Sequence, residues 1–402
     1  MTSTNISTNT HSSQRQRLGE LAAVFLKLGA TGFGGLAVQI AMMEEEAVRR
    51  RGWLDHQAFL DLVGASNLVP GPNAVKVALQ IGYARAGWAG FALAGGCFVA
   101  PAVLISAIFA WIYQRFGTLP QIEAILAGIK PAMLVVIAAA VWKLGRTAIT
   151  TWRGVALGLL VLAAALLGLS EALALPLGGL LGILWLRHDA PRPLPRAGAS
   201  ALVLAALDNL PRPSLPSAAL ALGAGTVAVG AVSLWGLGWF FLQVGAVLFG
   251  NGYVLITFLD DLVAYGWLSQ QQLLDAIAVG QVTPGPLLST ATFIGYMLAG
   301  GPGAVVATLA IFLPSVAAVA LLNPVLPQLR RAAWSRAFLS AVNICAVVLL
   351  GLVAARLAGS ILIGWQPWTI AAIAATLHLR WQISPGWLVL GGALVGWLLT
   401  AF

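Results

Sequence analysis

Two stretches of this sequence, NLVPGPNAVKVALQIGY at 67–83 and QVTPGPLLSTATFIGY at 281–296, interrupt apolar sequence with Pro-Gly-Pro. Proline lacks a backbone N–H and breaks or kinks a helix, except in the first turn, where that N–H would have no partner anyway. Each stretch therefore predicts a helix that begins in the middle of apolar sequence. The alternative is that the prolines only kink two helices that cross a membrane fully.

The composition favours a membrane protein. Of the 402 residues, 59% are hydrophobic and 9% are charged, and the mean hydropathy is +0.90. Soluble domains are roughly half apolar and about a quarter charged, so these few charges exclude a cytosolic enzyme and most soluble binding modules. The pI of about 10.3 raises nucleic-acid binding. The basic residues, however, lie at the ends of apolar runs, as membrane topology signals do.

Apolar runs long enough to cross a hydrocarbon core of about 30 Å predict the membrane segments. They lie near 20–43, 88–113, 122–142, 154–168, 170–187, 235–259, 303–326, 337–358, 361–378 and 386–402. The segments with the breaks, 54–84 and 268–299, either cross fully or re-enter, so we expect roughly 10–13 membrane segments. No segment alternates apolar and polar residues as the strands of an outer-membrane barrel do. The predicted fold is an all-α, polytopic membrane protein.

The spacing of rare residues predicts two homologous halves. FLKLGATGFGG (25–35) and FLQVGAVLFGNGY (241–253) each precede an acidic group, a Gly-Trp-Leu and a Pro-Gly-Pro. The matching residues keep their order, and their offset drifts only from 216 to 213. They include Gly29 with Gly245, Gly34 with Gly250, Trp53 with Trp267, Asp61 with Asp275, and Pro101 with Pro314.

The distribution of basic residues predicts that the halves are inverted. The loop 143–153 holds three basic residues, whereas its counterpart 356–366 holds only Arg356. The loop 114–120 holds one arginine, whereas its counterpart 327–336 holds three. Because cytoplasmic loops carry the excess of Lys and Arg, equivalent helices should run in opposite directions. Arg49–Arg51 is an exception, with Glu44–Glu46 beside it.

The chain divides into four predicted regions. Residues 1–17 are polar and predict a disordered cytoplasmic tail without a cleavable signal. Residues 18–187 and 235–402 form the two transporter repeats. Residues 188–234 form a linker rich in Pro and Arg, in which 218–234 is either a further membrane segment or a short surface helix.

Inverted repeats with helices broken at matching positions are typical of secondary transporters, whose sites lie near the membrane midplane. A helix N-terminus exposes backbone N–H groups and the positive end of the helix dipole, and both attract anions. We therefore predict an anion site at the two breaks, where glycines let the backbone approach closely, although helix packing alone would also explain the glycines. The backbone elements of this site are Pro70, Gly71, Pro72, Pro284, Gly285, Pro286, Gly34, Gly35, Gly250 and Gly252.

Polar side chains beside the breaks are the predicted anion ligands. Lys76 is the one basic residue in either broken helix, and a lysine there should face a cavity, an acid or an anion unless it snorkels to the interface. Asp61 and Asp275 are candidates for proton coupling, although solvated helix faces would explain them equally well. The predicted ligands are Asn73, Lys76, Gln80, Asn251, Thr283, Ser289, Thr290 and Thr292.

The sequence predicts neither an enzyme nor a metal or cofactor site. No second His or Cys stands at ligand spacing from His56, and no metalloprotease, nucleophile-elbow or Walker A motif occurs. A membrane enzyme would need an essential nucleophile or metal ligand, and a purely structural subunit would not need matched breaks.

The chain resembles the chromate ion transporter family in its long, two-domain form. The resemblance rests on TGFGG (31–35), Gly-Trp-Leu at 52–54 and 266–268, both Pro-Gly-Pro breaks and, most specifically, FGNGYVLITFLDDLV (249–263). It runs from about residue 18 to the end and departs at Leu36, where the family often has proline.

The resemblance implies chromate efflux across a bacterial inner membrane, conferring resistance. Chromate and sulfate are tetrahedral dianions of similar size, so sulfate is an expected competitor. An importer or exchanger of sulfate or another oxyanion is the alternative function. The expected partners are chromate and the lipid bilayer, with no nucleic acid, and a homodimer is one possible assembly.

Overall fold

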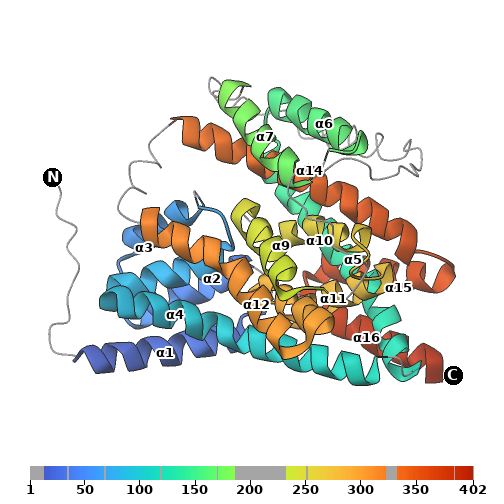
Figure 1. Cartoon of the computed structure of the whole chain (residues 1–402), viewed down its shortest axis with the longest axis horizontal. Coiled ribbons are helices and arrows are strands. Elements are labelled where there is room, and N and C mark those ends of the chain that lie inside the picture. Colours follow the sequence, from blue (N-terminus) through green and yellow to red (C-terminus); the bar gives the residue numbers. More distant parts are fainter. Residues whose placement is uncertain are drawn as a thin grey trace. The chain divides into compact units, whose positions relative to one another are not determined.

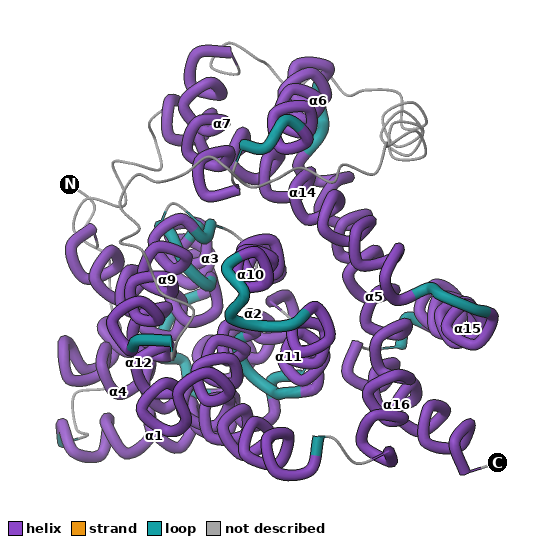
Figure 2. Tube along the Cα trace, turned by 45° about the vertical axis from the view of Figure 1, so that its right-hand side comes forward, coloured by secondary structure: helices purple, strands orange, loops and turns teal. Residues whose placement is uncertain are grey.

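The computed structural model describes residues 13–33, 36–67, 69–117, 120–169, 171–185, 232–249, 252–322, 333–383 and 385–401. Helices make up 88% of these residues, and Figure 2 shows that no strand occurs among them. The predicted all-α fold is therefore confirmed for the described part of the chain. The predicted linker 188–234 lies almost entirely outside it.

The helices follow one another along both halves of the chain (Figure 1). The first half contains α1 (Gln14–Thr31), α2 (Leu36–Glu44), the π-helix η1 (Glu45–Arg50), α3 (His56–Ser66), α4 (Asn73–Phe116), α5 (Pro120–Ala148), α6 (Trp152–Leu166) and α7 (Glu171–Trp185). The second half contains α9 (Leu234–Val247), the short 3₁₀ helix η2 (Gly252–Val254), α10 (Leu255–Ala264), α11 (Gln270–Val282), the 3₁₀ helix η3 (Leu287–Ser289), α12 (Thr290–Leu322), α14 (Ala333–Ile361), α15 (Trp365–Trp381) and α16 (Pro385–Ala401).

The first helix begins inside the segment 1–17 that we expected to be a polar tail. Ser13 caps α1: the Gln16 N–H donates to the Ser13 hydroxyl, and the Gln16 side chain accepts from the Ser13 N–H. This capping box satisfies two backbone donors at once. It explains why α1 starts at Gln14, ahead of Leu18, the first apolar residue of the helix.

Segments that alternate along the chain form two compact units. The first unit comprises Met1–Gly117, Leu237–Gly252 and Val279–Arg330, and the second comprises Thr118–Gly236, Tyr253–Ala278 and Arg331–Phe402. In the first unit, α4 packs against α1 and α12. In the second unit, α5 packs against α14, α15 and α16, and α14 packs against α7. Each unit therefore draws helices from both halves of the sequence.

A sharp bend divides α4 and another divides α12. The bends lie at Ala86–Gly87 and Ala299–Gly300, where the two glycines have φ/ψ of 62°/−148° and 61°/−152°. These conformations are almost exclusive to glycine. Beyond the bend in α4 the chain folds back on itself. This is seen at Gly82, where a Cβ would lie 2.2 Å from the carbonyl oxygen of Gly90. Residues 73–85 are thus a helical arm of about 20 Å, shorter than the apolar core of a membrane at about 30 Å.

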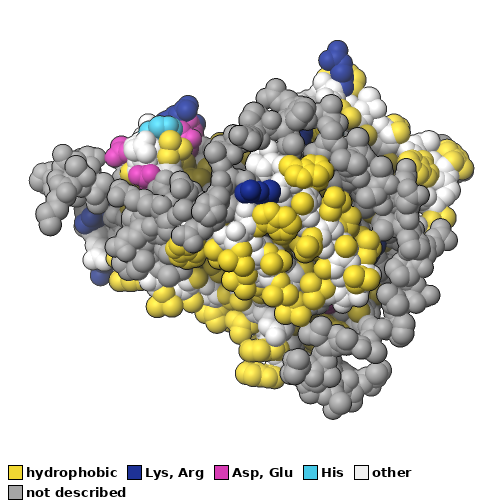
Figure 3. All heavy atoms as spheres, turned by 90° about the horizontal axis from the view of Figure 1, so that it is seen from above, with side chains coloured by type: hydrophobic (Ala, Val, Ile, Leu, Met, Phe, Trp, Pro, Cys, Tyr) yellow, Lys and Arg dark blue, Asp and Glu magenta, His cyan; other side chains and the backbone are white. Residues whose placement is uncertain are grey.

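The helices carry the surface expected of a multi-pass membrane protein. Within the described ranges, four segments are long and apolar enough to cross a membrane: Asn73–Phe116, Ala124–Ala148, Leu287–Leu321 and Ala337–Ile361. In the most apolar part of Asn73–Phe116 only 33% of the residues are buried, so most of that apolar surface faces outward. Figure 3 shows exposed hydrophobic side chains over a broad area of one face.

Exposed tryptophans mark the ends of several shorter helices. Trp152 begins α6, Trp185 ends α7 and Trp365 begins α15, and all three side chains are exposed. Tryptophan is enriched at the boundary between membrane and water, because its ring is apolar while its N–H needs a polar partner. The tryptophans agree with the apolar surface in placing the described helices in a membrane.

Candidate functional site

Both Pro-Gly-Pro breaks lie in the first unit, and each is held by a segment of the other half. The N–H of Gly71 donates to the carbonyl oxygen of Leu248, and the N–H of Gly285 donates to that of Gly32 at 3.2 Å. Gly71 has φ +102° and Gly285 has φ +89°, in the region that favours glycine. The two glycine N–H groups are therefore already engaged and do not point at an open anion site.

The start of α4 leaves backbone donors beside the first break. Pro72 is its N-cap and provides no side-chain hydrogen bond. The N–H of Lys76 donates to the Pro72 carbonyl oxygen at 3.2 Å, which closes the first helical turn. The N–H groups before it in that turn have no helical acceptor, as at every helix start. They are the backbone donors that the sequence predicted at this break.

Lys76 is fully buried on the first turns of α4. Its side chain is 0% exposed, and its ammonium donates to the carbonyl oxygen of Val69, next to Pro70. The side chain thus points back to the break rather than out to a membrane surface. An ammonium has three donors, and no carboxylate pairs with this one among the residues that the structure describes.

Three other predicted ligands have polar atoms without a partner in the described structure. They are Oδ1 of Asn73, both amide atoms of Gln80 and Oγ of Ser289. These side chains are 7%, 2% and 0% exposed. Buried polar atoms are almost always hydrogen-bonded, so their presence beside the breaks marks a place where a polar ligand or water would be stabilised.

The three predicted threonine ligands instead satisfy their hydroxyl groups within the fold. Thr283 and Thr290 each donate to a backbone carbonyl oxygen about one turn earlier, at 2.8 Å. The hydroxyl of Thr292 lies 2.7 Å from that of Thr308. A tetrahedral dianion offers only acceptors, so these threonines have no free donor for it in this conformation.

Two residues at the breaks were missed by the sequence reasoning. Ser315 on α12 is buried with an unpaired Oγ, and a Cβ on Gly71 would fall 1.5 Å from that oxygen. Gln39 on α2 is 5% exposed, and its Nε2 donates to the carbonyl oxygens of Gly285 at 2.7 Å and Gly32 at 3.2 Å. Both side chains are far in sequence from the breaks they contact, so no local sequence pattern predicts these contacts.

The glycine cluster of the predicted site is only partly described. Gly34, Gly35, Gly250 and Asn251 lie outside the described residues. Gly252 begins η2, and a Cβ there would lie 3.2 Å from that of Leu287, in the short helix after the second break.

The second unit contains a buried ion pair. Nζ of Lys130 on α5 lies 2.7 Å from Oδ1 of Asp275 on α11, and the two side chains are 8% and 2% exposed. Asp61, which matches Asp275 in sequence, is exposed on α3. The two predicted coupling carboxylates therefore have different environments. Lys130 was not among the predicted site residues. Its place inside the apolar run 122–142 is a signal that could have found it.

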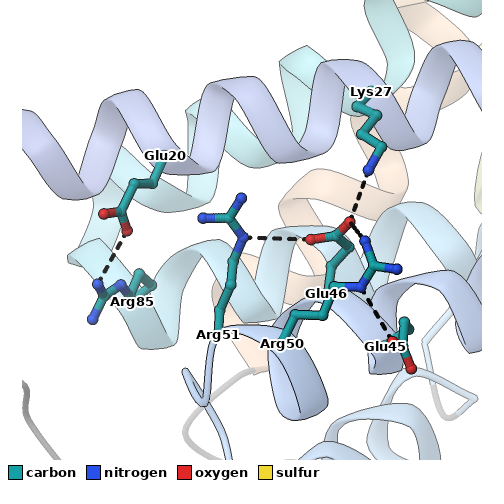
Figure 4. A network of polar contacts seen from close by, with 7 residues as sticks. All are labelled: Glu20, Lys27, Glu45, Glu46, Arg50, Arg51 and Arg85. Carbon is teal, nitrogen blue, oxygen red and sulfur yellow. Dashed lines mark hydrogen bonds and ion pairs between the residues drawn. The ribbon is translucent and has the colours of Figure 1, made fainter.

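Glu46 is the centre of a charged network at the start of η1 (Figure 4). Its carboxylate lies 3.0 Å from Lys27, 3.4 Å from Arg50 and 3.4 Å from Arg51. The hydrogen bond from Lys27, helped by both arginines, lowers the pKa of the Glu46 carboxyl although burial opposes this. The network joins α1 to η1, as expected for charged residues at a membrane boundary.

Trp53 extends this network towards α4. The guanidinium carbons of Arg51 and Arg85 lie 5.4 and 5.5 Å from the centroid of the Trp53 ring, within cation–π range. Arg85 also lies 3.3 Å from a Glu20 oxygen on α1. Trp53 thereby connects the loop after η1 to the arm of α4 that carries Lys76.

Across the described ranges, no group of three or more His, Cys, Asp or Glu side chains could hold a metal ion.

Comparison with known proteins places the chain among transporters. The model of a family described as Chromate transporter matches residues 19–183 and 235–397. A probable chromate transport protein of Synechococcus elongatus is 35% identical over 300 residues, which cover 74% of this chain and 73% of that protein. A chromate transport protein of Cupriavidus metallidurans is 29% identical over 404 residues, which cover 96% and 94%. One of Pseudomonas aeruginosa is 32% identical over 305 residues, which cover 74% and 71%. No solved structure matches.

Proposed function

The chain belongs to the chromate transporter family, and from this premise we propose that it is a secondary transporter that exports chromate across a bacterial inner membrane. The names of its relatives point to transport rather than catalysis. The membrane potential supports export of an anion rather than its import. An inside-negative potential favours the exit of one negative charge by about 2.3 kcal/mol per 100 mV, and of a dianion by twice that.

The observation that carries the proposal is the buried Lys76 beside the first break. An uncompensated ammonium is costly inside an apolar unit, and a bound anion would remove that cost. We place the oxyanion near the membrane midplane, between the start of α4 and the start of η3 and α12. Asn73, Gln80 and Ser289 support this placement, because they are buried and have unpaired polar atoms.

The proposal treats the two halves as inverted repeats around this site. Two features of the first unit support a two-fold relation. The bends at Gly87 and Gly300 have nearly equal φ and ψ. Each break also donates its glycine N–H to a residue of the opposite half, Leu248 or Gly32. Two helical arms related in this way could open the site alternately to either side.

We assign proton coupling to Asp275, and give Asp61 the second place because it is exposed. Asp275 is buried against Lys130, and a proton on its carboxylate would leave the Lys130 charge uncompensated. A buried pair that loses one partner is destabilised by about 3–5 kcal/mol. Protonation of Asp275 would therefore disturb this pair, and we propose it as the proton-dependent step of transport.

The pair can be tested with single and double variants. Lys130→Gln or Asp275→Asn alone should reduce both folded protein and transport, because each leaves one buried charge. The double variant should recover folded protein but lose the pH dependence of transport. If the double variant keeps the wild-type pH profile, coupling lies elsewhere and Asp61→Asn becomes the next variant to measure.

The proposed function is tested by chromate accumulation in sensitive bacteria, with and without this protein and with excess sulfate. Lower accumulation, rescued growth and a weaker effect in sulfate are expected. Lys76→Ala should abolish the effect, whereas Lys143→Ala, an exposed lysine at the far end of α5, should not. Unchanged or higher accumulation would overturn export and favour an importer of sulfate or a related anion.

A further inference from the structure

We propose that Lys76 at the first break compensates part of the charge of the oxyanion, and that the Ser315 hydroxyl is an anion ligand at the same break. This inference rests on the proposed function and makes its site one-sided, which means that the charged ligand lies at the first break and not at the second. Both breaks read Pro-Gly-Pro, but Lys76 follows only the first. Their tertiary surroundings differ in three ways.

The first difference is the residue that faces each break from the opposite half. Gly71 lies against Ser315 on α12, and Gly285 lies against Ala102 on α4. Ser315 and Ala102 follow Pro314 and Pro101, which match in the repeat, so they are equivalent positions. One break therefore faces a hydroxyl, and the other faces a methyl group that cannot hydrogen-bond.

The second difference is Gln39, which forms a hydrogen bond to the backbone of the second break. Its Nε2 donates to the carbonyl oxygens of both Gly285 and Gly32. At the repeat offset, its equivalent is Leu255, which has no such donor. The amide group of Gln39 thus holds the second break in place, and its N–H donors are already engaged by backbone carbonyl oxygens.

The third difference is charge. Lys76, with its ammonium on the Val69 carbonyl oxygen, lies at the first break. The second break has unpaired Ser289 Oγ and Gln281 Nε2 atoms, but both groups are neutral. In the first unit, Lys76 is the one buried lysine or arginine among the described residues. Lys76 at the first break would therefore compensate one of the two charges of a bound dianion.

The Ser315 hydroxyl is buried and, among the described residues, has a free donor that could bind such an anion. A serine within a helix commonly donates to the carbonyl oxygen one turn earlier. The Ser315 Oγ has no partner in the described structure although the side chain is 0% exposed. An oxyanion oxygen would satisfy this donor, and a hydrogen bond to a charged group is stronger than one between neutral groups.

The test is the KM for chromate in everted membrane vesicles, where export appears as uptake. Ser315→Ala should raise the KM about tenfold with a normal amount of folded protein, which corresponds to ~1.4 kcal/mol. Ser315→Thr keeps the hydroxyl and should keep most of the affinity. Ala102→Ser is the matched control at the equivalent position, and its KM should stay at the wild-type value. Ser106→Ala removes another buried, unpaired hydroxyl from α4 and should also leave the KM unchanged.

The outcomes separate this inference from the proposed function. If Lys76→Ala loses transport but Ser315→Ala keeps the wild-type KM, the one-sided site is wrong and the transporter assignment stands. A rise of the KM in Ser106→Ala as large as in Ser315→Ala would reveal a packing effect and overturn the ligand role. If Lys76→Ala transports normally, the anion site of the proposed function itself is misplaced.

Discussion

At the scale of single residues, Gly71 and Gly285 make the same turn but should tolerate a side chain differently. Both have positive φ, which costs other residues about 1–2 kcal/mol. A Cβ on Gly71 would also fall 1.5 Å from Ser315 Oγ, whereas one on Gly285 would approach the Ala102 Cβ at 2.9 Å. Gly71→Ala should therefore reduce the melting temperature in detergent much more than Gly285→Ala.

A third glycine provides the control for this comparison. Gly96 lies within α4, and a Cβ there would meet nothing within 4 Å. Gly96→Ala should leave the melting temperature unchanged or raise it slightly, because alanine favours the helix. If Gly71→Ala melts at the temperature of Gly96→Ala, the close packing of the first break is wrong.

Glu46 should make the stability of the protein sensitive to acid. Its folded pKa lies below the ordinary value of 4.5, mainly because Lys27 donates to the carboxylate. The carboxylate therefore stabilises the fold fully above pH 4.5, and this contribution is lost as the pH falls through the lower folded pKa. Glu46→Gln should lower stability at pH 7 by about 1 kcal/mol, and this difference should shrink as the pH falls below 4.5.

Melting temperatures across this pH range provide the measurement. The two proteins should differ most at neutral pH and converge in acid. Asp55→Asn, at the exposed N-cap of α3, is a carboxylate variant outside the network. A constant difference between wild type and Glu46→Gln from pH 3 to 7 would contradict an electrostatic role.

At the scale of elements, the bends in α4 and α12 depend on glycine for conformation and not for space. A Cβ on Gly87 or Gly300 would meet nothing within 4 Å, yet both residues have φ near +60° and ψ near −150°. Alanine is strained there by about 1–3 kcal/mol. Gly300→Ala should therefore lower the melting temperature and alter transport, by favouring a straighter helix.

The neighbouring glycine is a matched control for the bend. Gly301 is also open to a side chain and does not have positive φ. Gly301→Ala should behave as wild type in both measurements. Equal effects of Gly300→Ala and Gly301→Ala would show that the bend does not need a glycine conformation.

At the scale of the whole molecule, neither half of the chain should fold alone. Each unit combines helices of both halves, and α4 of the first half packs against α12 of the second. A chain that ends at residue 190 would expose the apolar surfaces that α12, α14 and α16 cover. Expressed separately, the two halves should be degraded or aggregate.

Co-expression of both halves provides the decisive measurement. Residues 1–190 and 230–402, produced together, should co-purify and restore chromate resistance. The cut lies in the predicted linker, so no described helix is divided. If one half alone is stable and active, the division into interleaved units is wrong.

The sequence by itself determined the helical membrane fold and the family, and it located the two Pro-Gly-Pro segments. Composition limits the solvent in which a chain can fold, and Pro-Gly-Pro acts on the backbone beside it, so both features can be recognised locally. The same local chemistry could have predicted the hydroxyl bonds of Thr283 and Thr290, since threonine in a helix commonly donates to the preceding turn.

Only the tertiary structure decided which side chains meet at the breaks. Ser315 on α12 contacts Gly71, Gln39 on α2 contacts Gly285, and Lys130 pairs with Asp275. These contacts join residues far apart in the chain, and their register depends on how whole helices pack. The repeat gave both breaks the same Pro-Gly-Pro, and the sequence already separated them by Lys76, which follows only the first. Packing added a further difference, because Ser315 faces one break and Ala102 faces the other.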